Sequence, residues 1–110
     1  MEIKKVRDGD RLTVALSGQL NAVTAIDLDK DLKAELEGVK DLVIDLAELE
    51  YIASAGLRIL LKTQKRMNNQ GYMLIKNIKP EVRDVLDMTG FSKLLSIDDS
   101  SAPKKLSLSF

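Results

Sequence analysis

Ser54 is the residue best placed for covalent chemistry in this sequence, because it directly precedes the apolar stripe of a predicted helix, Leu57, Leu60 and Leu61. A hydroxyl at a helix start faces the partial positive charge of unpaired backbone amides. A phosphate on that hydroxyl would be held by the amides and would present a charge of about −1.5 to −2 to a partner. The simpler alternative is that Ser54 only caps the helix, since serine is a preferred N-cap residue.

The composition excludes most other kinds of catalytic site. Cysteine and histidine are both absent, which removes disulfides, thiol nucleophiles, most zinc sites and the commonest general base. The sequence also has no Walker loop, no Gly-x-Gly-x-x-Gly fingerprint and no paired carboxylates in an obvious cleft. We therefore expect a binding protein rather than an enzyme, with no cofactor and no metal.

The charge balance argues against nucleic acid and membrane surfaces as partners. The 17 basic and 17 acidic residues cancel, and the aromatic residues are two Tyr and two Phe with no Trp. Such a chain lacks both the basic patch and the stacking platform that nucleic acid binding needs. The first five residues lead straight into charged sequence, and no apolar run is long enough to cross a bilayer. These features predict a cytoplasmic protein without direct membrane insertion.

The elements that must position Ser54 follow from the hydrophobic pattern. An antiparallel pair of strands is expected around the Asp8-Gly9 turn signal. A capping box of Thr24 and Asp27 then predicts a helix to about residue 37. An apolar run bracketed by acids predicts a central parallel strand at 41–46, and a loop at 47–53 leads to a helix at 55–69.

The remaining sequence completes a single domain over residues 1–98. A strand is predicted at 72–75, a short helix from Pro80 to Gly90, and one more short strand at 94–97. Strand and helix alternate, which predicts an α/β fold with a four- or five-stranded mixed sheet flanked by three to four helices. Residues 99–110 are predicted to be a tail, either flexible or docked through its alternating end.

Functional loops in such a fold lie beyond the carboxyl ends of the strands. These are predicted at 18–23, 47–53 and 77–79. Asp45, at a strand end, is expected to cap a neighbouring loop rather than to act in a switch. Tyr51 and Ile52 fit equally well the apolar centre of an interface or a contact beneath the loop, and Arg58 fits a solvated face or an ion pair with an acidic partner.

Two segments carry motifs that resemble those of a known domain family. Residues 44–57, Ile-Asp-Leu-Ala-Glu-Leu-Glu-Tyr-Ile-Ala-Ser-Ala-Gly-Leu, are similar to a family pattern of hydrophobic-Asp-Leu-Ser, a few residues, an aromatic residue and Asp-Ser-Ser-Gly-Leu. Residues 17–25, Ser-Gly-Gln-Leu-Asn-Ala-Val-Thr-Ala, resemble the family segment Gly-x-Leu-Asp-x-x-Thr-Ala. The family that these motifs resemble is that of STAS domains, and the predicted order of strands and helices also matches its fold over about residues 2–97.

The resemblance implies a bacterial anti-sigma factor antagonist. In that family's manner, Ser54 would be phosphorylated by a cognate anti-sigma factor serine kinase, which ends binding, and a metal-dependent serine phosphatase would restore it. The residues expected to contact the partner are Asn21, Ala22, Val23, Thr24, Tyr51, Ile52, Ala53, Ser54, Ala55, Gly56 and Arg58.

Departures from the family pattern at two acidic positions and at the second serine bear on the switch. Asn21 and Ala53 replace acids, and Ala55 replaces the second serine. Loss of two carboxylates beside the hydroxyl alters the surface that a kinase would recognise. The alternative function is therefore a phosphorylation-independent STAS scaffold or accessory subunit of a signalling or lipid-transport complex.

Overall fold

The computed structural model describes residues 1–98, so the predicted tail at 99–110 lies outside the described residues. In chain order the elements are β1 (Glu2–Asp8), β2 (Arg11–Leu20), α1 (Ala22–Glu35), β3 (Asp41–Ile52), α2 (Ser54–Gln70), β4 (Tyr72–Lys76), α3 (Pro80–Met88) and the 3-10 turn η1 (Phe91–Lys93).

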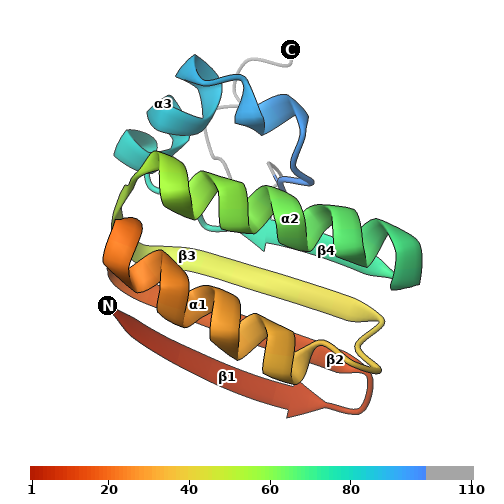
Figure 1. Cartoon of the computed structure of the whole chain (residues 1–110). Helices are drawn as coiled ribbons and strands as arrows, with labels where there is room; N and C mark the ends of the chain where they lie inside the picture. The colour runs from red at the N-terminus through yellow and green to blue at the C-terminus, as the bar shows by residue number, and fades with distance from the viewer. Residues whose placement is uncertain (99–110) are drawn as a thin grey trace.

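The strands form one mixed sheet in the order β1-β2-β3-β4. β1 and β2 pair antiparallel, whereas β3 pairs parallel with both β2 and β4. Each parallel connection passes through a helix, and α1 and α2 lie side by side across the same face of the sheet (Figure 1). The predicted α/β class and mixed sheet are confirmed, and of the four or five strands predicted the sheet has four within residues 1–98.

The core lies between this sheet face and the two helices. Alternate residues of β2 point into it, and Leu12, Val14 and Leu16 are at most 1% exposed. Leu28 and Leu32 of α1 and Leu57 and Leu60 of α2 are also buried. Leu57 and Leu60 of the apolar stripe predicted for α2 are therefore confirmed as core residues, whereas Leu61 is only half-buried.

The predicted loops at 18–23 and 47–53 are wrong, because β2 and β3 continue pairing to Leu20 and Ile52. The pairing of β2 with β3 shifts register twice, and at each shift β3 contains one residue more than β2. One shift lies between Asp45 and Glu48, and the other lies between Leu49 and Tyr51. Buried positions in this part of β3 therefore recur at every third residue, Leu46, Leu49 and Ile52, rather than at every second. The alternation by which a strand is recognised in sequence is lost there.

Two smaller expectations also need correction. The capping box of α1 is formed by Asn21 and Thr24, not by Thr24 and Asp27. The predicted strand at 94–97 is reduced to a single parallel bridge between Ile75 and Ile97, supported by Ile75 N–H donating to Ser96 O at 2.9 Å. The chain there first turns through η1, so too few residues remain extended to form a strand.

Candidate functional site

The start of α1 and the start of α2 lie next to each other because they follow paired strand ends. Leu20 of β2 is the register partner of Ile52 in β3. One residue further on, Ala53 N–H donates to Leu20 O at 2.9 Å. Both helices consequently begin at the same edge of the sheet (Figure 1).

The start of α1 is fixed by reciprocal hydrogen bonds. Asn21 Oδ1 accepts the amides of Val23 and Thr24, each at 3.0 Å, and Thr24 Oγ1 accepts the amide of Asn21 at 2.8 Å. The Thr24 hydroxyl in turn donates to Gln19 O at 2.9 Å. Asn21 therefore has a structural role that satisfies the free amides of the helix start.

Ser54 is the first residue of α2, and its side chain is exposed. The N-cap position belongs to Ala53, which has no side chain able to accept a hydrogen bond. Within residues 1–98 the Ser54 hydroxyl takes part in no hydrogen bond. The interpretation of Ser54 as the capping residue is therefore wrong, and its hydroxyl is available to water or to a partner protein.

Exposed apolar side chains surround the two helix starts. Val23 and Ile26 of α1 are 71% and 58% exposed, and Tyr51 at the end of β3 is 49% exposed. Val23 and Ile26 are three residues apart, so they lie on one face of α1. Ile26 was not among the residues expected from the sequence, although an isoleucine off the buried stripe of an amphipathic helix is a usable signal.

The expected contact residues divide into accessible and buried ones. Ile52 and Gly56 lie in the interior and present no side chain at the surface. The others are exposed or half-buried: Asn21, Ala22, Val23, Thr24, Tyr51, Ala53, Ser54, Ala55 and Arg58. We call these nine residues together with Ile26 the helix-start surface.

Asp45 has a structural role, as the sequence indicated. Its Oδ1 accepts the amide of Ala47 at 3.0 Å and the side-chain amide of Asn77 at 3.1 Å. Asn77 has a positive φ of 60° in the connection after β4. Asp45 thus ties that connection to the irregular part of β3.

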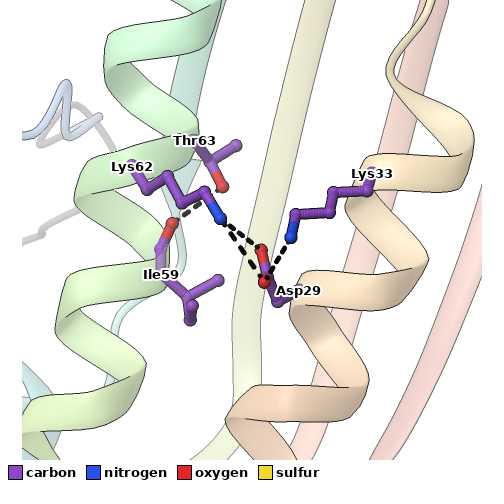
Figure 2. A network of polar contacts seen from close by, with 5 residues as sticks. All are labelled: Asp29, Lys33, Ile59, Lys62 and Thr63. Carbon is purple, nitrogen blue, oxygen red and sulfur yellow. Dashed lines mark hydrogen bonds and ion pairs between the residues drawn. The ribbon is translucent and has the colours of Figure 1, made fainter.

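An ion network joins α1 to α2 behind the helix-start surface. Asp29 of α1 pairs with Lys62 of α2 at 3.3 Å and with Lys33 at 3.2 Å (Figure 2). Partial burial alone would raise the pKa of Asp29, but hydrogen bonds from Lys33 and Lys62 outweigh it and lower the pKa below its ordinary value. The same contact raises the pKa of Lys33. The network holds the two helices in register.

Other kinds of site are not found in the part of the chain that the structure describes. No cluster of acidic side chains between residues 1 and 98 could hold a metal ion. No helix in this range is both long and apolar enough to cross a membrane. A hollow of about 300 Å³ lies between β1, β2 and β3, lined by residues such as Lys4, Ser17 and Asp45, and contains no residue of the helix-start surface.

Comparison with known proteins places these features in a family context. A family model described as "STAS domain" matches residues 2–103. BtrV of Bordetella bronchiseptica, whose name describes it as a candidate anti-sigma factor antagonist, is 35% identical over 91 residues, covering 81% of this chain and 78% of BtrV. The anti-sigma F factor antagonist of Paenibacillus polymyxa is 30% identical over 92 residues, covering 81% of this chain and 79% of that protein.

The fold is also similar to that of the Bacillus anti-sigma factor antagonist SpoIIAA. Its unphosphorylated form superposes with a TM-score of 0.75 at 14% identity, covering 96% of each chain. Its phosphorylated form gives 0.70 at 13% identity, covering 96% of this chain and 97% of SpoIIAA. At such identities the likeness concerns the fold alone.

Proposed function

The chain belongs to the STAS domain family, and from this membership we propose that it is an anti-sigma factor antagonist. In its unmodified form it binds an anti-sigma factor through the helix-start surface and so releases the sigma factor. Relatives of at least 30% identity carry that functional name, which supports the assignment. The protein acts as a binding module in the cytoplasm and has no catalytic activity of its own.

The observation that carries the proposal is the free hydroxyl of Ser54 at the centre of this surface. It is exposed, it is not used for capping, and it stands where α1 and α2 begin together. Val23, Ile26 and Tyr51 supply apolar contact area around it. An apolar centre with a polar rim is the usual composition of a protein interface.

Ser54 is the phosphorylation site of the switch. The anti-sigma factor is itself a serine kinase: the Ser54 oxygen bonds to the γ-phosphorus of ATP, the bond to the β-phosphate oxygen breaks, and ADP leaves. The hydroxyl proton passes to a base on the kinase. A metal-dependent serine phosphatase reverses the modification by hydrolysis, which returns the hydroxyl and releases inorganic phosphate.

Phosphorylation ends binding by electrostatics and desolvation. Docking would remove water from nearly two negative charges at the centre of the surface, or would place them against groups of the partner that repel them. The cost is roughly 3 kcal/mol or more. Three kcal/mol corresponds to a change of about a hundredfold in affinity. The switch therefore needs no change in the fold.

The neutral residues at positions 21 and 53 favour a second candidate. Asn21 and Ala53 stand where the family pattern carries acids, so a kinase that reads those carboxylates would not recognise this chain. In that case the protein is a phosphorylation-independent scaffold or accessory subunit, and Ser54 is only one contact among several.

Two substitutions at one position separate the candidates. Affinity for each anti-sigma factor kinase of the source organism is measured by calorimetry with Ser54→Ala and Ser54→Asp. The switch predicts that Ser54→Ala binds like the natural chain and that Ser54→Asp binds at least tenfold more weakly. Equal affinity of the two variants for the same partner would remove the switch and leave the scaffold.

A further inference from the structure

Helix α2 carries an uneven charge. Its 17 residues include Arg58, Lys62, Lys65 and Arg66 but no acidic residue. The whole chain has no net charge, so this helix is a local concentration of positive charge. The cations also lie on the helix that begins at Ser54.

Two of the four cations already have partners. Lys62 bonds to Asp29 on α1 at 3.3 Å, and Arg66 Nε donates to Gln70 Oε1 at 3.2 Å. Arg58 and Lys65 are exposed and make no side-chain hydrogen bond or ion pair within residues 1–98.

The freedom of Arg58 has a cause in the packing of α1 against α2. Lys62 meets an acid because Asp29 lies opposite it (Figure 2). One helical turn nearer the start of each helix, α2 carries Arg58 and α1 carries Ala25 and Ile26, which have no charge. Among the residues that the structure describes, Arg58 is therefore a cation without a counter-ion, one turn from Ser54.

Ser54 and Arg58 are four residues apart within α2, a spacing that places two side chains next to each other on the helix surface, with Cβ atoms about 5–6 Å apart. A guanidinium group presents paired N–H donors that match phosphate oxygens. We propose that Arg58 is the intramolecular counter-ion of phosphorylated Ser54, an inference that rests on the proposed modification of that serine.

The pairing gives Arg58 two exclusive states. In the unmodified protein its guanidinium is exposed and available to a carboxylate on an anti-sigma factor. After phosphorylation the guanidinium is held by the phosphate of its own helix. One modification thus adds negative charge to the helix-start surface and withdraws a cation from it.

The test uses the full chain with phosphoserine placed at position 54 by genetic encoding, so that neither a kinase nor a partner is needed. Titration followed by phosphorus NMR gives the second pKa of the phosphate, ordinarily about 6. A neighbouring cation stabilises the dianion and lowers that pKa. Removing the cation with Arg58→Gln should raise it by about 0.4 unit.

Lys65→Gln is the matched control, because it removes another exposed cation of the same helix that lies three turns from Ser54. It should leave the pKa of the phosphate unchanged, and Arg58→Lys, which keeps the charge without the paired donors, should give an intermediate value. The pairing is overturned if Arg58→Gln leaves the pKa unchanged or if Lys65→Gln shifts it equally. Backbone amide spectra report whether each variant keeps its fold.

Because the phosphate is installed without the kinase, this outcome is separate from the proposed function. An unchanged pKa would remove the role of Arg58 but leave Ser54 as a switch. Absence of Ser54 phosphorylation in the host would remove the switch while the measured pKa difference still stood.

Discussion

Gly56 of α2 lies so close to Leu20 of β2 that a methyl group at position 56 would come within 2.6 Å of Leu20 Cγ. Ile52 Cγ1 would be 3.2 Å away from the same methyl group. The first turn of α2 is thereby seated directly on the end of the sheet, where it exposes Ser54. A glycine in the motif is thus required by close packing, although it lies in a helix.

Gly56→Ala is expected to destabilise the protein by about 1 kcal/mol net, because overpacking of about 1–3 kcal/mol outweighs the better helix propensity of alanine, worth about 1 kcal/mol. Chemical denaturation measures the free energy of unfolding. Leu20→Ala is destabilising by itself. The double variant that carries both Gly56→Ala and Leu20→Ala should lose less stability than the sum of the losses in the two single variants. Additive effects would show that the two residues do not compete for space.

The start of α2 lacks the capping hydrogen bond that Asn21 gives to α1. Ala53→Asp should therefore stabilise the protein by about 1 kcal/mol, since it supplies an acceptor for the free amides of the first turn. Thermal unfolding checks the gain. Ala53→Asn, which caps without charge, should give most of the same increase, and no increase with either variant would contradict the capping geometry.

The bridge from Asp29 to Lys33 and Lys62 should make stability depend on pH. Asp29→Asn is expected to cost about 0.5–1 kcal/mol at pH 7, as expected for a partly exposed ion pair. Because the pKa of Asp29 is lowered in the folded state, this contribution is complete above the ordinary value of 3.8 and is lost as pH falls through the lower folded pKa.

Unfolding by urea at several pH values measures the difference between the natural chain and Asp29→Asn. Asp27→Asn is the control, because Asp27 is on the same helix and has no ion pair within the described residues. A stability difference for Asp29→Asn that stayed constant down to pH 2 would contradict the assigned role of its carboxylate.

The exposed apolar residues of α1 should contribute to partner binding rather than to folding. Ile26→Ser is expected to weaken binding of the anti-sigma factor about tenfold, the effect of losing an interface contact worth about 1.4 kcal/mol. The free energy of unfolding should change little. Tyr72→Ser is the matched control, because Tyr72 is 79% exposed at the start of β4, the opposite end of the sheet.

Calorimetry measures the affinity of the Ile26→Ser and Tyr72→Ser variants for the anti-sigma factor. If Tyr72→Ser weakened binding as much as Ile26→Ser, the partner would not be confined to the helix-start surface.

Much of the fold could be predicted from the sequence because its elements are locally consistent. The apolar run at 42–44 indicated the central strand, and Leu57 and Leu60 indicated the buried face of α2. These features depend on residues close together in the chain. The pattern was sufficient where one strand or helix buries one regular face.

The site itself was less predictable because it depends on contacts between distant segments. The boundary at Ala53 follows from its hydrogen bond to Leu20, 33 residues earlier in the chain. That bond makes Ala53 the N-cap and leaves Ser54 free, a distinction that residue type could not provide. The local pattern can place Ile26 off the buried stripe of α1, but its position at the edge where α2 also begins depends on how α1 sits on the sheet.

Our proposal is that phosphate on Ser54 alone separates this protein from its anti-sigma factor. Its most direct test is calorimetric titration of the cognate anti-sigma factor kinase with the chain carrying either serine or encoded phosphoserine at position 54. Phosphoserine should weaken binding about a hundredfold or more. The same affinity for both forms would contradict it.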